Sequence, residues 1–325
     1  MKHMIYISEE TASELLRMDE CIPLIAETLR SYARKEVTQV LRTALPIGLD
    51  GSNWLGVMPA VMNSRGIAGC KLITIFPGNG SAGLESHQGV VALFETVTGT
   101  LKAVIDGGAI TAIRTAAASA VATEALARED SRVLAILGTG IQARRHVEAL
   151  RLVRKIEEVR VWGRSTEGVL GFKKDVEAAC SIPVVVCETV RQAVVTADIV
   201  CTVTAATEPV LLGGYLKPGI HVNAVGACRP NSRELDTEAI ARARLFGDSV
   251  ESVTAEAGDF IIPFLRGEIT RGHLLGEIGE VLIGAIPGRT SEGDITVFKS
   301  LGIAIEDLAA AELIYNNYMK KLHKT

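Results

Sequence analysis

The chain has 325 residues, of which 48% are apolar and 22% charged, as is typical of a globular protein with one large domain or two smaller ones. A net charge of −4 and a pI near 5.9 give no electrostatic reason to expect nucleic acid or an anionic membrane as a partner. The first residues, MKHMIYISEETASELL, lack the long apolar segment of a secretory signal, and no uncharged apolar run could span a bilayer. We therefore expect a cytoplasmic protein.

The cysteines form no C-x-x-C pair, and most of them lie in apolar surroundings, so we expect buried, reduced thiols. No cluster of His and Cys has the spacing of zinc ligands, and we predict no metal site. The six cysteines are Cys21, Cys70, Cys180, Cys187, Cys201 and Cys228.

The first third of the chain changes from helical to strand-like periodicity. Leu and Ile recur at helical spacing over residues 10–36, with a break expected near Pro23. Short β-rich runs separated by Gly, Asn and Pro follow over residues 38–105 and predict a mostly antiparallel sheet. Within this region, ETVTGTLKAV is typical of a hairpin with its turn at Thr98–Gly99.

An alanine-rich helix is expected over residues 111–129, and strands and helices alternate after it. Such alternation is typical of a parallel, doubly wound sheet. The last helix, residues 303–324, is amphipathic and follows this section, so we expect it to pack back on the first domain. The expected strands cover residues 132–137, 158–162, 183–187, 198–203, 220–225 and 243–247.

The fold class that we predict is therefore α/β. A Rossmann-type doubly wound parallel sheet over residues 114–301 would be joined to a mixed α+β domain. That second domain would combine residues 1–113 with residues 302–325 at the other end of the chain.

The segment RVLAILGTGIQA fits the G-x-G-x-x-G/A pattern of a dinucleotide site, with Gly138, Gly140 and Ala143 at its fixed positions. The pattern follows a strand and begins a helix that starts with Ile141 and Gln142, as the fingerprint requires. The alternative is a plain strand-to-helix turn. We interpret the segment as a site where the helix N-terminus binds a pyrophosphate.

The end of the second strand indicates which dinucleotide is bound. NAD sites usually have an acid there to bind the ribose 2′-hydroxyl, but this chain has Gly163, followed by Arg164 and Ser165. A guanidinium can form paired hydrogen bonds with a phosphate, so we predict a preference for NADP(H), with NAD(H) possible. Arg164 could instead be a solvated loop residue.

Several motifs occur in an order that resembles one family. They are GVMPA (56–60), SHQGVVALFE (86–95), TAIRTAAASAVAT (111–123), ILGTGIQA, TAATEP (204–209), NAVGACRPNSRELD (223–236) and VFKSLGIAIED (297–307). Together they resemble the ornithine cyclodeaminase/mu-crystallin family, and most closely its mu-crystallin-like ketimine reductases. The resemblance implies a homodimer whose interface and substrate surface lie in the first domain, with a nicotinamide cofactor in the second.

The resemblance also implies that Arg42, Lys71 and Arg114 bind a substrate carboxylate, and that Lys71 and Arg114 belong to the catalytic machinery. The residues themselves agree, because Lys71 interrupts an apolar strand and a buried ammonium needs a partner. A cluster of three cations is expected where an anion binds between them. For any one of the three alone, a structural salt bridge is the commoner explanation.

Further cofactor contacts follow from the resemblance alone. Ser86 and His87 are placed near the cofactor, although a histidine there could equally be a hydrogen-bonded loop residue. Glu256 is a weaker candidate contact, and Asn223 is expected only to hold the end of a strand. Three more residues are implied near the nicotinamide or its ribose: Thr204, Val225 and Lys299.

Cys228 departs from the cyclodeaminase pattern, which has an aspartate in this loop. A carboxylate can accept protons from an ammonium group, whereas a thiol near its normal pKa does so poorly. We include Cys228 among the catalytic candidates, although it could be a small apolar filler. Its presence argues against a lyase in either case.

These observations predict an NAD(P)H-dependent reductase of small cyclic imine carboxylates, such as Δ1-pyrroline-2-carboxylate or Δ1-piperideine-2-carboxylate, which yields the L-amino acid. The alternatives are ornithine cyclodeaminase, which makes proline and ammonia, and alanine dehydrogenase-type reductive amination of a 2-oxo acid. A binding protein that keeps the fold for a ligand is a rival of another class. The intact glycine and cation motifs argue against it.

Overall fold

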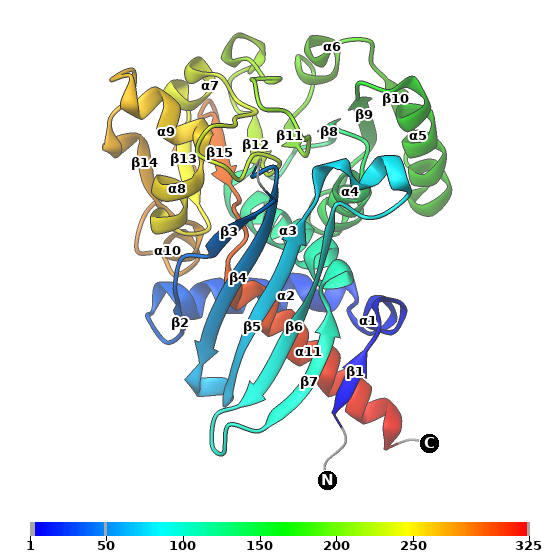
Figure 1. Ribbon diagram of the computed structural model, residues 1–325. Helices are drawn as coiled ribbons and strands as arrows, with labels where there is room; N and C mark the ends of the chain where they lie inside the picture. The colour runs from blue at the N-terminus through cyan, green and yellow to red at the C-terminus, as the bar shows by residue number, and fades with distance from the viewer. Residues whose placement is uncertain (1–3, 49–50, 324–325) are drawn as a thin grey trace. The chain divides into compact units, whose positions relative to one another are not determined.

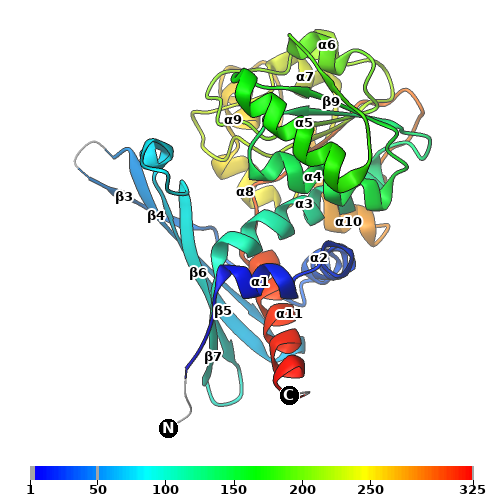
Figure 2. The same cartoon turned by 90° about the vertical axis from the view of Figure 1, so that its right-hand side faces the viewer.

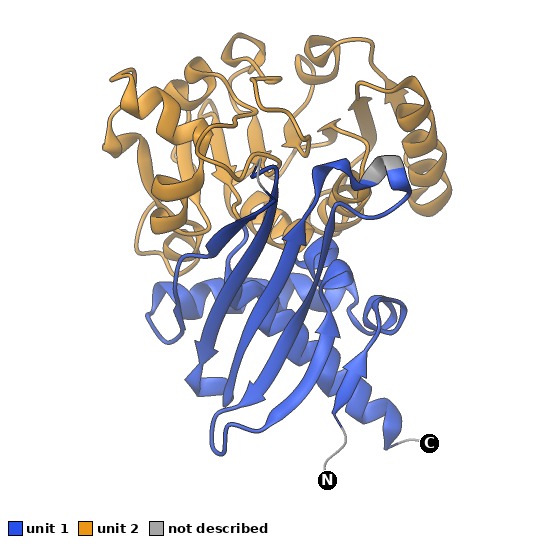
Figure 3. Ribbon diagram, viewed as in Figure 1, with its two compact units in different colours: residues 1–114, 302–325 blue, residues 115–301 orange. Residues whose placement is uncertain are grey.

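The computed structural model describes residues 4–48 and 51–323, without the side chains of residues 80 and 81. The chain divides into two compact units (Figure 3). Unit 1 comprises Met1–Arg114 and Gly302–Thr325, and unit 2 comprises Thr115–Leu301. Among the helices of the described residues, none is long and apolar enough to cross a bilayer.

Unit 1 is built on a seven-stranded sheet in the order β1-β7-β6-β5-β4-β2, and β3 also pairs with β4 (Figure 1). All pairs are antiparallel except the parallel pair of β1 and β7, so the expected antiparallel sheet is confirmed. The strands are β1 Ile5–Ile7, β2 Thr38–Gln39, β3 Thr43–Ile47, β4 Asn53–Met62, β5 Ile67–Ile75, β6 His87–Glu95 and β7 Leu101–Asp106. Short 3₁₀ turns occupy Asn63–Arg65 and Pro77–Ala82.

Helices of unit 1 lie along one face of this sheet (Figure 2). They are α1 Glu9–Leu15, α2 Met18–Ala33 and α11 Ala304–Leu322. Side chains along β4 alternate accordingly: Met58, Ala60 and Met62 are buried, whereas Pro59 and Val61 are half-buried on the other face. The contacts of α11 with β4, β5 and β6 confirm that the last helix packs on the first part of the chain.

Two local predictions in unit 1 need correction. The break in the first helical region lies at Leu16 and Arg17, not near Pro23, which is inside α2. The reason is the Ser8 cap and the exit of the chain at Leu16, which make α1 a separate short helix. The hairpin of β6 and β7 is confirmed, with Gly99 in the left-handed conformation at a φ of 71°.

Unit 2 contains an eight-stranded, wholly parallel sheet in the order β10-β9-β8-β11-β12-β15-β13-β14 (Figure 1). The chain order reverses between β8 and β11, which is the arrangement of a doubly wound Rossmann-type sheet. The predicted α/β fold class is therefore confirmed. The strands are β8 Val133–Leu137, β9 Glu158–Trp162, β10 Val184–Val186, β11 Ile199–Thr202, β12 His221–Ala224, β13 Arg244–Gly247, β14 Leu274–Glu277 and β15 Thr296–Lys299.

The helices of this region alternate with the strands, and 3₁₀ turns occupy Gly213–Tyr215 and Arg271–His273. The alanine-rich helix α3 runs over Gly107–Leu126, about one turn earlier than predicted, and includes the boundary between the units. The remaining helices are α4 Ile141–Val153, α5 Thr166–Cys180, α6 Val190–Val194, α7 Thr237–Arg242, α8 Val250–Glu256, α9 Gly258–Leu265 and α10 Ile278–Leu282.

Sequence periodicity identified the six strands β8 to β13 but missed β14 and β15. Each of these two has only four residues, β14 contains Gly276, and β15 ends in Lys299, so neither presents a clear apolar run. The omission matters, because β15 inserts between β12 and β13 and brings Lys299 beside Ala224 and Gly247 in the strand register.

Candidate functional site

The glycine turn after β8 has the backbone that a dinucleotide site needs. Gly138 has a φ of 121°, and a Cβ there would lie 2.6 Å from the carbonyl oxygen of Val203. Gly140 is the N-cap residue of α4, and apart from Gly140 and its two chain neighbours no heavy atom of the described residues lies within 4 Å of the place where its Cβ would be. The first turn of α4, with exposed Ile141 and half-buried Gln142, therefore leaves backbone space for a phosphate group.

The end of β9 has Gly163 in place of the acid that commonly binds a ribose 2′-hydroxyl. A Cβ at Gly163 would lie 2.8 Å from Cγ2 of Thr139 in the glycine turn, so a larger residue would push that turn aside. Arg164 is exposed beside it. The hydroxyl oxygen of Ser165 accepts a hydrogen bond from the Gly168 backbone at 3.2 Å and caps α5, which leaves the hydroxyl proton to donate elsewhere.

The loops after β11 and β12 are joined by one buried carboxylate, Glu234. It accepts hydrogen bonds from the hydroxyl and backbone N–H of Thr204, from the hydroxyl of Thr202 and from the backbone N–H of Gly226, each at 2.7 Å. Burial raises the pKa of Glu234, while Lys299 and the threonine hydroxyls oppose that rise. Sequence reasoning missed Glu234, although the motif NSRELD that contains it had been singled out.

A second buried carboxylate holds Lys299 at the end of β15. Asp259 Oδ1 accepts hydrogen bonds from the backbone N–H groups of Glu234 at 2.8 Å and Leu235 at 2.9 Å. Asp259 Oδ2 lies 2.9 Å from Lys299 Nζ, and each side chain is only 1% exposed. Burial lowers the pKa of Lys299, but Asp259, with Cys228 and Glu234, raises it above its ordinary value, so this ammonium stays charged.

Cys228 lies in the loop after β12, in the same part of unit 2. Its thiol donates to the carbonyl oxygen of Val225 at 3.4 Å and lies 4.0 Å from the carbonyl oxygen of Ser300, the residue after Lys299. Val225 is buried, and its N–H donates to Thr202 at 3.0 Å. The structure thus brings Thr204, Val225, Cys228 and Lys299 together at the carboxyl ends of neighbouring parallel strands, where doubly wound folds bind their ligands.

The cations predicted to bind substrate lie in unit 1, around the first turn of α11. Lys71 projects from the helix-covered face of β5 and is 2% exposed. Its Nζ lies 3.0 Å from Oδ1 of Asp307, and Arg114 Nε donates to the same oxygen at 2.8 Å. Arg114 Nη1 also donates to Glu306 Oε2 at 3.1 Å.

Arg42 reaches the same region through the backbone. Its Nη2 donates to the carbonyl oxygen of Gly302 at 3.2 Å. Gly302 has a φ of 74°, and a Cβ there would lie 2.5 Å from Arg114 Nη1, so glycine gives the Arg114 guanidinium room. Burial lowers the pKa of Lys71 to about 8, assisted by Arg114 and Arg42 and opposed by Asp307.

Sequence reasoning missed Asp307 and Glu306. It took the anion that explains the three cations to be the substrate, whereas the chain itself supplies two carboxylates. The available signal was the pair of acids in IAIED at the start of an otherwise apolar helix face. Acids are common in the first turn of a helix, where the helix dipole favours them, so this pair does not by itself indicate a partner for the cations.

The remaining candidates have local partners. Ser86 and His87 lie at the start of β6, where the hydroxyl of Ser86 and Nδ1 of His87 are 2.9 Å apart. Asn223 is fully buried and donates to Thr123 Oγ1 at 2.9 Å, which is a structural role. Glu256 ends α8 and is half-buried.

Comparisons with known proteins cover almost the whole chain. Ketimine reductase mu-crystallin of Mus musculus is 40% identical over 317 residues, which are 96% of this chain and 97% of that protein. The Thermococcus litoralis Δ1-pyrroline-2-carboxylate reductase in complex with NADH and L-proline is 34% identical with a TM-score of 0.95, covering 98% of both chains. An archaeal alanine dehydrogenase dimer with bound NAD is 31% identical with a TM-score of 0.93, covering 98% of both chains.

The family model described as "Ornithine cyclodeaminase/mu-crystallin family" matches residues 1–322. The match includes both stretches of unit 1 and all of unit 2. The chain therefore belongs to the ornithine cyclodeaminase/mu-crystallin family.

Proposed function

We propose that the protein is an NAD(P)H-dependent reductase that converts a small cyclic imine carboxylate to the L-amino acid, with Δ1-pyrroline-2-carboxylate or Δ1-piperideine-2-carboxylate as the substrate. The observation that carries the proposal is the pair of buried cations, Lys71 and Arg114, in a chain similar over its full length to ketimine and pyrroline-2-carboxylate reductases. Residues 1–113 with 302–325 would form the substrate-binding and dimerisation domain. Residues 114–301 would form the dinucleotide-binding domain.

The chemistry asked of the chain is modest. Lys71, Arg114 and Arg42 bind the substrate carboxylate and so orient the C=N carbon, and burial of the first two keeps their interaction with that carboxylate strong. A bound reduced nicotinamide supplies the hydride that this carbon accepts. A protonated cyclic imine already carries the proton of its nitrogen, so the chain needs no acid at that atom.

The residues around the glycine turn fit a dinucleotide. The left-handed Gly138 and the open space at Gly140 suit a pyrophosphate on the first turn of α4. NADH or NAD is bound in the two similar structures described above. We propose a preference for NADP(H), because Gly163 leaves no acid at the end of β9 and Arg164 presents an exposed guanidinium there.

Cys228 favours the reductase over the cyclodeaminase. Cyclodeamination of ornithine must accept protons from an ammonium group, and a thiol that donates to the Val225 carbonyl is a poor acceptor. Alanine dehydrogenase activity remains the second candidate because of the similarity to the archaeal dimer.

An assay over a panel of substrates with both cofactors tests the proposal. We expect NADPH oxidation with the five- and six-membered cyclic imine carboxylates, without any need for ammonia. Proline and ammonia formed from ornithine with catalytic NAD would instead show a cyclodeaminase. NADH oxidation that requires both ammonia and pyruvate would show an alanine dehydrogenase. Tight cofactor binding without turnover of any of these substrates would favour a binding protein.

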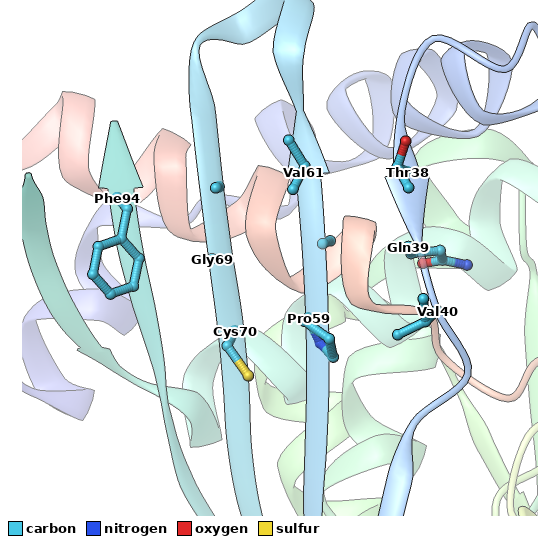
Figure 4. A pocket seen from close by; sticks show the side chains of 10 residues that line it. Thr38, Gln39, Val40, Pro59, Val61, Gly69, Cys70 and Phe94 are labelled. Carbon is cyan, nitrogen blue, oxygen red and sulfur yellow. The ribbon is translucent and has the colours of Figure 1, made fainter. Parts of the chain in front are cut away.

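We also propose that the protein is a homodimer formed through the open face of the unit 1 sheet. A shallow groove of about 300 Å³ lies on that face, and Figure 4 shows its side chains. The groove is almost wholly apolar. The helices of unit 1 pack on the opposite face of the sheet. The similarity to a dimeric alanine dehydrogenase supports a second copy of this chain as the molecule that covers the groove. The groove residues used in this argument are Val40, Pro59, Val61, Ala68, Cys70 and Phe94.

The cytoplasm is the location that we propose for this dimer. All six cysteines are free thiols, and Cys21, Cys187 and Cys201 are buried. Proteins of oxidising compartments tend to use cysteines in disulfides, whereas a reducing compartment keeps thiols of this kind intact.

A further inference from the structure

Asp307 at the start of α11 contacts two buried cations of unit 1, Lys71 and Arg114, through a single atom. Its Oδ1 lies 3.0 Å from Lys71 Nζ and 2.8 Å from Arg114 Nε. Both Lys71 and Asp307 are at least 98% buried, so their side chains are held in one geometry without competition from water. We propose that Asp307 is a positioning residue, which keeps Lys71 protonated and directs its ammonium toward the substrate carboxylate.

The proposal rests on the proposed function, in which Lys71 binds that carboxylate. An ammonium has three protons. Within the described part of the chain, Lys71 Nζ has one hydrogen-bond acceptor, Asp307 Oδ1. Asp307 therefore fixes the direction of one N–H and leaves the other two for an anionic ligand.

The charges that face Lys71 explain why a fixed carboxylate is needed. Arg114 of α3 and Arg42 both lower the pKa of Lys71, and Asp307 of α11 opposes them. Glu306, adjacent in α11, pairs with Arg114. With Lys71 protonated, these three cations and two carboxylates have one net positive charge, which suits a substrate with a single carboxylate.

The group packed against this cluster from α2 does not change that charge. Burial and the nearby Glu306 raise the pKa of the Cys21 thiol to about 12, so Cys21 stays neutral. The charge of the cluster near neutral pH is therefore controlled by Lys71, whose pKa, about 8 in the intact chain, lies closest to that range. Loss of the Lys71 proton would remove the net charge that attracts an anion.

Removal of the Asp307 charge should lower the pKa of Lys71. An opposite charge at this distance typically changes a pKa by about 1–3 units. In Asp307→Asn, Lys71 should therefore lose its proton at or below about pH 7, one unit or more below the wild-type value. The KM for the imine carboxylate should then rise at pH 8 and recover toward the wild-type value at pH 6.

The experiment measures KM and kcat for Δ1-pyrroline-2-carboxylate from pH 6 to pH 9 in wild type and variants. Titration of the substrate is common to all variants and cancels in the comparison. Asp307→Glu keeps a carboxylate and should restore the wild-type pH profile. Glu312→Gln is the matched control, because Glu312 is a buried carboxylate of the same helix but pairs with Arg65 and not with Lys71. The dependence of KM on pH should be unchanged in this variant.

A second readout is independent of turnover. In protein labelled with ¹³C at lysine Cε, the Lys71 resonance, assigned by its absence in Lys71→Met, should titrate near pH 8 in wild type and at least one unit lower in Asp307→Asn. A Lys71 resonance that titrates at the same pH in Asp307→Asn as in wild type would overturn the proposal. If Asp307→Asn does not fold, a wild-type KM that stays constant across the titration of Lys71 would overturn it. A KM for Asp307→Asn raised equally at pH 6 and pH 8 would also overturn it. If wild type reduced no cyclic imine, the proposed function would fail while the NMR titration still tested the effect of Asp307 on Lys71.

Discussion

Replacement of Glu234 by glutamine should weaken both the fold of unit 2 and its affinity for a nicotinamide cofactor. The carboxylate accepts four hydrogen bonds of 2.7 Å, two from backbone N–H groups and two from hydroxyls. An amide offers one oxygen, so its NH₂ group must face one of the two backbone donors, at Thr204 or Gly226. A hydroxyl can rotate to accept from that NH₂ group, but the backbone N–H cannot.

One charge-assisted hydrogen bond to a buried N–H is therefore lost, which costs about 1.5–3 kcal/mol. Relief of carboxylate burial, which is visible in the raised pKa of Glu234, offsets part of this cost. The net loss should be about 2 kcal/mol, equivalent to a fall in thermal midpoint of about 4–8 °C for a domain of this size. Because the loops with Thr204 and Gly226 form the proposed cofactor edge, the Kd for NADPH should rise by about tenfold.

The assay combines thermal unfolding with a fluorescence titration of NADPH. Glu208→Gln is the control, because Glu208 is an exposed carboxylate in the loop after β11 and its replacement should change neither quantity. If Glu234→Gln left both the midpoint and the Kd at wild-type values, the carboxylate would not be organising these loops, and the argument from its hydrogen bonds would fail.

Three further outcomes are expected. Arg164→Ala should raise the KM for NADPH at least tenfold and leave that for NADH nearly unchanged, and equal effects on the two would refute the phosphate contact. Burial lowers the pKa of His146 to about 4 and of His221 to about 3, so the folded state resists protonation that the unfolded state accepts below pH 6.5. Each histidine should therefore lower the free energy of unfolding by about 1.4 kcal/mol as the pH falls from 7.5 to 5.5. Urea unfolding measures this change, and a free energy of unfolding that does not vary over this range would contradict the prediction. Val61→Glu on the open sheet face should give monomers in light scattering, whereas Leu170→Glu, at a side chain 55% exposed on α5, should not.

Periodicity and turn chemistry predicted most of the fold, because those signals are local. The strand before Gly138 is a continuous apolar run, and the glycine turn that follows it has a known backbone requirement, so both could be identified from a dozen residues. Pro23 shows the limit of local signals. It marks a helix break in general, but here it lies within α2, and the chain interrupts the helical region earlier, at Leu16.

The pairing of charges could not be predicted, because it depends on contacts between distant parts of the chain. Lys71 and Asp307 are separated by 236 positions, and Arg114 and Asp307 by 193. An unpaired cation in an apolar strand indicates that some anion is present. It does not indicate whether that anion belongs to a ligand or to the protein. The same holds for Glu234 and Asp259, whose partners lie at the ends of β11 and β15 and in the loop after β12.

The contribution of Cys228 can be separated from that of its neighbours by two substitutions. Its thiol makes a weak hydrogen bond of 3.4 Å to Val225, so Cys228→Ala removes little and should keep kcat/KM within a few-fold of wild type. Cys228→Asp adds a carboxylate near Lys299, which already pairs with Asp259, and the added negative charge should lower kcat/KM further than alanine does. A hundredfold loss in Cys228→Ala with unchanged NADPH affinity would instead show that the sulfur takes part in the reaction.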